Sequence, residues 1–539
     1  MNHLYYGDNL HVLRASIASA SVDLIYLDPP FNSKRDYNLL FKSPKGHQSD
    51  AQIEAFKDSW TWGDQAEREL DELTRQKNTD VALMINALVS FLGKNDMLAY
   101  LVMMANRLLE MHRVLKPTGS LYLHCDPSAS HYLKIVLDAV FGKTNYRSEI
   151  SWKRQSAHND AKQGRKQYGN IRDVIFFYTK SDDWTWHWQY LAYDKSYTDK
   201  FYRHREPITG RFYQLGDLTA PGGGSPEKRN PHYEFLGVTR YWRFSEANMI
   251  KMYENREIVQ TGPGTVPRHK RYLDEALGVS LQNDWGDVLS TSKHESLGYP
   301  TQKPLSLLRR IIATSSNAGD VILDPFCGCG TAVHAAQSLK RRWIGIDITH
   351  LAVSLIEKRL NDAFGKHSDY TVVGTPGDLD AARDLARRDK YQFQYWAVSL
   401  VDAQPFQGKK KGADGGIDGV KFFRDLDKKE VRKILVSVKG GGNVGLSMVK
   451  DLITTVTHGG AEIGLFVTLT PPTQPMLAEA AKAGFYTSVK GNKFARLQIL
   501  TIEDLLSGKV RAEHPDYEPD LNFKKAKRES TGVQDELGF

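Results

Sequence analysis

The sequence predicts an α/β protein built on a doubly wound, parallel sheet, with an inserted region and a smaller C-terminal α/β domain. Apolar runs at 23–27 and 120–124 have the length of buried strands. Helical apolar spacing occurs between and after them, at 97–116 and 128–140. A strand, a glycine turn and a helix follow one another again at 321–340. This alternation indicates a parallel sheet, because parallel neighbours need long crossover connections, usually helical.

The composition is that of an ordinary globular protein and excludes several classes. Of 539 residues, 41% are apolar and 25% are charged, which excludes a mostly disordered chain. No window approaches the roughly 18 uninterrupted apolar residues of a membrane span. Three cysteines cannot build a disulfide framework, and the N-terminus has no secretory pattern, so we expect a cytoplasmic protein. The net charge of +8 permits a polyanionic partner.

The first buried strand ends at Asp28-Pro29-Pro30-Phe31, where the two prolines stop the ladder because neither has an N–H to donate. The tetrapeptide suits the activation of an exocyclic amino group on a base. A carboxylate and a main-chain carbonyl can each accept one amino hydrogen, which turns the nitrogen lone pair toward an electrophilic methyl group. The adjacent aromatic can stack on a base flipped out of the duplex. Taken alone, the motif is equally compatible with a strand-ending turn.

The strand at 321–323 leads into Asp324-Pro325-Phe326-Cys327-Gly328-Cys329-Gly330-Thr331. Its two glycines permit a sharp turn and the close approach of a ligand. Asp347 ends the next strand, where doubly wound folds bind ribose hydroxyls. Position 333 is Val rather than a third glycine, and no Gly-Lys-Ser/Thr follows. We therefore expect a nucleoside without phosphates, and a plain strand–helix turn is the alternative.

Together the two motifs resemble the amino-group DNA methyltransferases that use S-adenosylmethionine. The catalytic motif precedes the glycine motif, as in the family's β group and in type III modification subunits. The segments Gly7–Leu10, Arg113–Ser120 and Thr301–Leu305 are also similar to family segments. The resemblance implies a methyltransferase sheet with a catalytic half at 1–150 and a cofactor half at 296–365.

The resemblance also implies roles for individual residues. Asp28 and Pro29, with Pro30, would activate the amino group, and Phe31 would stack on the base. The cofactor would be held by Asp8, Thr301, Lys303, Asp324, Phe326, Gly328, Gly330 and Asp347. Aspartate at the first motif position is more typical of adenine-N6 members than of cytosine-N4 members, which remain the alternative.

Residues 151–295 are rich in aromatic and basic side chains and stand where β-group members carry a target-recognition region. Phosphate contacts need cations, and base edges are read by polar side chains. We expect this insert to bind double-stranded DNA through Lys153, Arg154, Arg165 and Lys166. A solvated charged surface is the alternative for any one of them. The sequence leaves open a homodimer.

A linker at 366–390 leads to a last block at 391–508, and a polar tail at 509–539 is expected to be mobile. Strands at 417–423 and 434–438 bring Asp418 and Lys439 to adjacent strand ends. An acid and a lysine so placed can hold Mg²⁺ and orient water for phosphodiester attack.

This block resembles a PD-(D/E)XK nuclease of the Mrr type, with Asp418 as the Mg²⁺ ligand. Two positions depart from the pattern. Ser437 replaces an acid or Gln, and Gln394 replaces the helix Glu. The sequence therefore predicts a single-chain restriction–modification enzyme, with a noncatalytic DNA-binding module as the alternative.

Overall fold

The computed structural model describes most of the chain. The described residues are 1–30, 60–76, 78–156, 166, 168–225, 227–299, 301–365, 369–406, 416–426, 430–515 and 524–529, together with the strands 35–42 and 48–58. They form two compact units. One contains the described residues up to 187 and from 283 onward, and the other is 188–282.

The larger unit contains a nine-stranded sheet in the order β16-β6-β7-β5-β2-β17-β18-β1-β19. Neighbouring strands are parallel, except that β7 runs antiparallel to β5 and β6. The predicted doubly wound parallel sheet is confirmed for the central strands, and antiparallel pairing occurs only toward one edge. The strands are β1 (Asn2–Tyr6), β2 (Val22–Leu27), β5 (Leu115–Cys125), β6 (Tyr146–Lys153), β7 (Arg172–Thr179), β16 (Asp284–Trp285), β17 (Val321–Asp324), β18 (Arg342–Asp347) and β19 (Tyr370–Val373).

Helices pack on both faces of this sheet. Successive side chains of a strand point to opposite faces. In β5, Leu121 and Leu123 join a core with residues of α1, α4 and α5, whereas the hydroxyl of Tyr122 lies 2.7 Å from that of Ser315 on α8. The helices are α1 (Asn9–Ser16), α2 (Asp64–Thr74), α3 (Thr79–Leu92), α4 (Asp96–Val114), α5 (Ser130–Phe141), α8 (Leu305–Ser315), α9 (Thr331–Ser338) and α10 (His350–Phe364).

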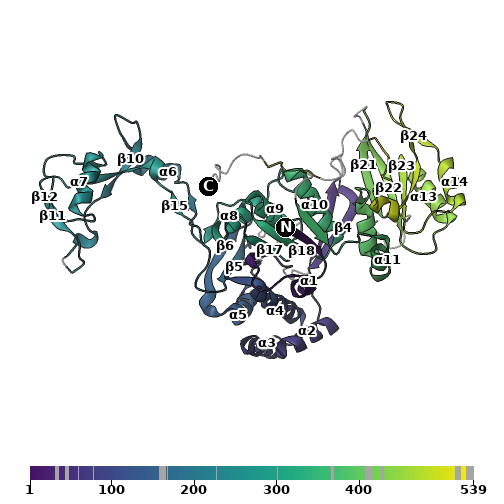
Figure 1. Cartoon of the computed structure of the whole chain (residues 1–539), viewed down its shortest axis with the longest axis horizontal. Coiled ribbons are helices and arrows are strands. Elements are labelled where there is room, and N and C mark those ends of the chain that lie inside the picture. Colours follow the sequence, from purple (N-terminus) through teal and green to yellow (C-terminus); the bar gives the residue numbers. More distant parts are fainter. Residues whose placement is uncertain are drawn as a thin grey trace. The chain divides into compact units, whose positions relative to one another are not determined.

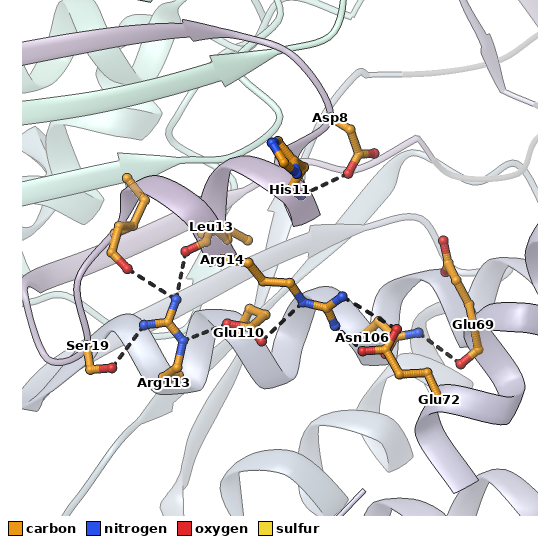
Figure 2. Close-up of polar contacts among 11 residues, drawn as sticks. Asp8, His11, Leu13, Arg14, Ser19, Glu69, Glu72, Asn106, Glu110 and Arg113 are labelled. Carbon is orange, nitrogen blue, oxygen red and sulfur yellow. Dashed lines mark hydrogen bonds and ion pairs between the residues drawn. The ribbon is translucent and has the colours of Figure 1, made fainter. Parts of the chain in front are cut away.

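A polar network ties α1 to α2 and α4 (Figure 2). Arg113 of α4 donates to the main-chain oxygens of Leu13 and Ile17 at 2.7 and 3.1 Å. Arg14 of α1 pairs with Glu72 of α2 and lies 3.3 Å from Glu110 of α4. Side chains from three helices therefore fix the helix that begins directly after Asp8.

The region predicted as an insert, 151–295, divides between the two units. β6 and β7 are strands of the main sheet, and 188–282 forms the smaller unit around Trp242, which is fully buried. This unit has a four-stranded antiparallel sheet, β13-β14-β10-β9, and two two-stranded antiparallel sheets, β11-β12 and β15-β8. Its elements are β8 (Tyr190–Leu191), α6 (Lys195–Phe201), β9 (His204–Arg205), β10 (Phe212–Asp217), β11 (His232–Phe235), β12 (Val238–Tyr241), α7 (Glu246–Glu254), β13 (Ile258–Val259), β14 (Arg268–Tyr272) and β15 (Val279–Ser280).

The C-terminal block contains a five-stranded sheet, β20-β21-β22-β23-β26, in which β22, β23 and β26 are parallel. Figure 1 labels its strands β21, β22 and β23. The strands predicted at 417–423 and 434–438 correspond to β21 and β22. The range predicted as a linker, 366–390, contains β19 of the main sheet and α11 (Leu379–Arg388), which packs in the core of this block. The other elements are α12 (Lys390–Ser399), β20 (Gln404–Pro405), β21 (Gly419–Arg424), β22 (Val431–Lys439), α13 (Leu446–His458), β23 (Ile463–Thr468), α14 (Gln474–Lys482), β24 (Phe485–Thr487), β25 (Lys493–Ala495), β26 (Leu497–Thr501) and α15 (Ile502–Leu506).

The tail predicted to be mobile is held in place at 524–529. The main-chain nitrogen of Glu529 donates to the oxygen of Ala363 at 3.0 Å, and that of Ala526 donates to Asp362 at 3.2 Å. Polar composition misleads here, because the carboxylate of Glu529 meets Arg309 and His334, two partners that are distant in sequence. Across the described residues, no helix has the length and apolar character needed to cross a membrane.

Candidate active sites

A cavity of about 320 Å³ opens at the carboxyl ends of β2, β17, β18 and β1, which are neighbours in the sheet. In open α/β sheets, ligands bind at this edge. The predicted site residues that line the cavity are Asp8, Asp28, Pro29, Pro30, Thr301, Lys303, Asp324, Phe326, Gly328 and Asp347. Phe31, the predicted stacking residue, lies outside the described residues.

Asp28 presents one carboxylate oxygen that has no hydrogen-bond partner among the described residues. Its Oδ2 is paired with Nζ of Lys303, which the sequence predicts as a cofactor contact. Its Oδ1 is buried and accepts no hydrogen bond from the described residues. A buried polar atom without a partner is costly. This oxygen is therefore placed to accept a hydrogen from a ligand that enters the cavity.

A buried polar chain runs behind Asp28, and it includes His124 near the end of β5, to which no sequence motif assigns a role. Tyr26 lines the cavity, and its hydroxyl lies 3.1 Å from Nδ1 of His124. Nε2 of His124 lies 3.2 Å from Asp173, which also contacts Arg154 at 3.2 Å. Burial alone would raise the pKa of Asp173, but His124 and Arg154 hold it below its ordinary value. These hydrogen-bonded side chains keep Tyr26 fixed at the wall of the cavity.

The glycine loop has the left-handed conformation that its sequence requires. Gly328 and Gly330 have φ angles of 53° and 74°. A Cβ on Gly330 would lie 2.8 Å from Cγ1 of Ile356, and one on Gly328 would lie 3.2 Å from Tyr299. Gly330 itself does not line the cavity. It supports the loop from behind, where α10 approaches too closely for a side chain.

Two buried acids of the cavity have raised pKa values. Burial raises the pKa of Asp324 to about 8, and nearby Asp28 and Asp347 act in the same direction. Burial raises the pKa of Asp347 to about 6, against the opposing effect of its hydrogen bonds. Asp347 accepts from the main-chain nitrogen of Gly328 at 2.8 Å and from that of Thr349 at 3.0 Å. It therefore links the glycine loop to the end of β18.

The charge of the cavity favours a cationic ligand. Four acids line it, Asp8, Asp28, Asp324 and Asp347, and Asp324, with a pKa of about 8, is the one that a bound cation would ionise. Arg107 and Lys303 are its cations, and both are already paired with acids. Like charges repel strongly in such partly buried surroundings. The lining therefore disfavours a pyrophosphate, in agreement with the predicted preference for a nucleoside without phosphates.

No sequence motif points to Arg107 of α4, which is 4% exposed. Its Nη2 donates to Asp8 at 2.9 Å, and its Nε donates to Oδ1 of Asn9 at 2.6 Å. The amide of Asn9 donates in turn to the main-chain oxygen of Pro325 at 2.9 Å. Arg107 thereby holds together the loops after β1 and β17. The only available signal is a lone arginine on an apolar helix face.

The predicted DNA-binding residues differ in how exposed they are and in whether they already pair with another side chain. Arg154 is paired with Asp173, whereas Lys153 is half-buried on β6. Lys166 is exposed, and the nearby Tyr168 is 98% exposed. Arg165 lies outside the described residues. Of the four, Lys166 is the described residue most open to a phosphate.

Asp418 and Lys439 lie at one end of the C-terminal sheet, as the sequence predicts. Oδ2 of Asp418 accepts from the main-chain nitrogen of Val438 at 2.7 Å, directly beside Lys439. Nζ of Lys439 would lie 3.9 Å from a Cβ on Gly416. Ser437 donates to the oxygen of Gly416 at 2.8 Å, so its hydroxyl proton is engaged.

The donor set of this second site suits a weakly held Mg²⁺. Within the described ranges, no three His, Cys, Asp or Glu side chains gather as metal ligands. Mg²⁺ is commonly bound through only one or two carboxylates plus water and substrate phosphates. Asp418 supplies one carboxylate, so the remaining ligands would be water and the DNA backbone.

Comparison with known proteins divides the chain in two. Residues 22–358 match the family described as DNA methylase, and 385–498 match the restriction endonuclease family of the Mrr type. The chain is 29% identical over 308 residues to the type II methyltransferase M.EcaI of Enterobacter cloacae, which covers 54% of this chain. It is 26% identical over 385 residues to the Mod subunit of the type III restriction-modification enzyme StyLTI of Salmonella typhimurium, which covers 68% of this chain.

These matches span 65% of M.EcaI and 54% of the StyLTI Mod subunit. A third relative, the DNA adenine methyltransferase YhdJ of Escherichia coli, is 24% identical. That match covers 67% of this chain and 83% of YhdJ.

Proposed function

The chain belongs to the DNA methylase family, and we propose that it transfers a methyl group from S-adenosylmethionine to N6 of adenine in double-stranded DNA. The observation that carries this proposal is the free, buried Oδ1 of Asp28 at the wall of an acid-lined cavity. The acids suit S-adenosylmethionine, a nucleoside with a sulfonium cation and no phosphate.

Asp28 and Pro29 activate the target nitrogen. The lone pair of an exocyclic amino group is delocalised into the base, so the nitrogen is a poor nucleophile. Oδ1 of Asp28 and the main-chain carbonyl of Pro29 each accept one amino hydrogen, which aims the lone pair at the methyl group. The pairing of Lys303 with Oδ2 holds the carboxylate in the orientation that leaves Oδ1 toward the cavity. When bound, S-adenosylmethionine supplies the electrophilic methyl group.

The remaining lining residues hold the cofactor. Asp347 binds the ribose hydroxyls, and Asp8 contacts the adenine end, where Arg107 fixes its position. Asp324, Phe326, Gly328, Thr301 and Lys303 surround the methionine end, and Gly330 supports the loop. The fit is supported by the closure of the glycine loop onto Asp347 through the nitrogen of Gly328.

We propose adenine rather than cytosine as the target base for two reasons. The first motif position is an aspartate, Asp28, and the relative YhdJ is an adenine methyltransferase. The test is mass spectrometry of nucleosides from DNA treated with the purified chain and labelled S-adenosylmethionine. We expect N6-methyladenine. N4-methylcytosine alone would overturn the base assignment and leave the methyltransferase assignment standing.

We infer that the insert selects the target sequence. The exposed Lys166 and Tyr168 precede the smaller unit, and exposed arginines occur within it at 203, 205, 229, 240 and 243. Cations contact phosphates, and arginine reads guanine edges in the major groove. Exchange of 188–282 for the matching segment of a relative should change the methylated sequence.

We propose a second activity, DNA cleavage by the Mrr-type block, in a single-chain restriction–modification enzyme. It is supported by the placement of Asp418 beside Lys439. Asp418 would hold Mg²⁺, and Lys439 would stabilise the attacking water or the phosphate charge. Incubation of methylated and unmethylated DNA with Mg²⁺ or Mn²⁺ tests this. A chain that nicks neither substrate carries a noncatalytic DNA-binding module instead.

A further inference from the structure

The C-terminal segment 524–529 contacts three helices around the cofactor loop. Oε1 of Glu529 accepts from Nη2 of Arg309 on α8 at 2.6 Å and lies 2.9 Å from Nε2 of His334 on α9. The main chain of Glu529 bonds to Ala363, whose carbonyl would otherwise have no partner within its own helix, α10. The segment is therefore attached by both side-chain and main-chain bonds.

The direction of the hydrogen bonds at His334 is fixed. Its Nδ1 accepts from Nε of Arg359 at 3.1 Å, since a guanidinium can only donate. Burial lowers the pKa of His334 to about 4, so the imidazole is neutral and carries one proton. That proton is on Nε2 and is donated to Glu529. Arg359, His334 and Glu529 thus form one directed chain.

Arg359 holds the cofactor loop from behind. It is 3% exposed. Its Nη1 donates to the main-chain oxygen of Cys329 at 3.1 Å and to Oγ1 of Thr331 at 3.0 Å, on either side of Gly330. Cys329 and Thr331 line the cavity. In the part of the chain that the structure describes, no carboxylate lies within ion-pair distance of Arg359. The hydrogen bonds from Arg359 to His334 and from His334 to Glu529 link it to a carboxylate indirectly.

We propose that Glu529 is a positioning residue for the cofactor site, acting through His334 and Arg359 on the loop 327–331. The segment 524–529 is then a strap that completes the methyltransferase domain from beyond the C-terminal block. This inference rests on the proposed use of S-adenosylmethionine.

The physical consequence is a change in cofactor affinity. Without the carboxylate, the buried Nε2–H of His334 and the partly exposed guanidinium of Arg309 lose their acceptor, and the hydrogen-bonded chain that orients Arg359 ends at an unsatisfied His334. The loop then has more freedom to move away from the ligand. A hydrogen bond to a charged group contributes enough to change an equilibrium by roughly tenfold. The apparent KM and the Kd for S-adenosylmethionine should rise by about that factor.

The test uses the full chain with Glu529→Ala, Glu529→Gln and the control Arg528→Ala, which removes an exposed neighbouring side chain. Calorimetry gives the Kd for S-adenosylmethionine, and initial rates separate KM from kcat. We expect Glu529→Ala to raise Kd and KM about tenfold with kcat unchanged. Glu529→Gln keeps an acceptor for His334 and should give a smaller rise, and Arg528→Ala should match the wild type.

A purely structural loss would lower the active fraction, and hence kcat, without changing KM. That result, or an unchanged Kd in both Glu529 variants, overturns the positioning role. If the wild type itself binds no S-adenosylmethionine, the proposed function fails first. The two failures are therefore distinguishable.

Discussion

Asp28 is the residue on which methyl transfer depends most directly. In the proposed mechanism its buried Oδ1, which accepts no hydrogen bond from the described residues, would meet the target amine, and other residues would hold the cofactor. Asp28→Ala should therefore lower the methylation rate by roughly a hundredfold or more, the scale of losing a positioned acid–base or hydrogen-bonding group. The Kd for S-adenosylmethionine should stay within about twofold of wild type. A filter assay with labelled cofactor checks the rate, and residual activity above about a tenth of wild type would contradict the assignment.

Asp324 should make cofactor binding pH-dependent. Burial raises its pKa to about 8, so the acid is mostly protonated at neutral pH. A cationic cofactor favours the ionised form, so binding releases a proton, and the affinity should rise with pH until it levels above about 8. Asp347, with a pKa of about 6, contributes at lower pH.

Calorimetry between pH 6.5 and pH 8 checks this expectation, which is a slope of up to about one logarithmic unit of Kd per pH unit. Asp324→Asn serves as the control. Its side chain at position 324 cannot ionise, whereas the ionisable groups of the ligand titrate as before. Equal slopes in the wild type and the variant would show that Asp324 does not titrate on binding.

At the scale of elements, the turn from β17 to α9 depends on Gly330. An alanine there would adopt a φ of 74° and clash with Ile356. Gly319 is a matched control, because its φ is 85° and no atom lies within 4 Å of its added Cβ. Gly319→Ala should cost about 1 kcal/mol of unfolding free energy and leave cofactor binding intact.

Gly330→Ala should cost more and also weaken cofactor binding, because the loop must move away from α10. Urea denaturation and calorimetry measure the two effects. Equal stability losses in the two variants would mean that α10 accommodates the added methyl group at position 330 without strain.

Lys166, which lies between β6 and β7, should contribute to the salt dependence of DNA binding. Lys166 is exposed and makes no ion pair among the described residues. If it contacts one phosphate, Lys166→Ala should reduce the slope of log K against log salt by about 0.9. Lys134, which pairs with Asp138, is the control and should leave the slope unchanged when replaced by Ala. An unchanged slope in Lys166→Ala would exclude the phosphate contact.

At the scale of the whole molecule, the two proposed chemistries reside on different sheets. Asp28 follows β2 of the nine-stranded sheet, and Asp418 precedes β21 of the five-stranded sheet. Asp418→Ala and Lys439→Ala should abolish Mg²⁺-dependent nicking and leave methylation intact, while Asp28→Ala should do the opposite. Plasmid nicking and methyl incorporation on one preparation measure both. Cleavage that survives Asp418→Ala would refute the assigned nuclease site.

The extent of the inserted unit shows where sequence patterns lose information. Basic and aromatic composition begins at 151, yet β6 and β7 belong to the main sheet, and the separate unit starts at 188. Composition reports the surface that a segment presents. It does not report which strands pair, since pairing depends on partners far along the chain.

The sequence by itself determined the features that contiguous residues encode. Asp28-Pro29-Pro30 stops a strand, and the glycine loop turns a strand into a helix, because backbone sterics act over a few residues. Only the tertiary structure decided that Lys303 pairs with Asp28, that Arg107 holds Asp8, and that Glu529 reaches the cofactor loop through His334. Each of these contacts joins elements brought together by packing. Packing depends on shape and buried charge across the whole fold, which no local pattern records.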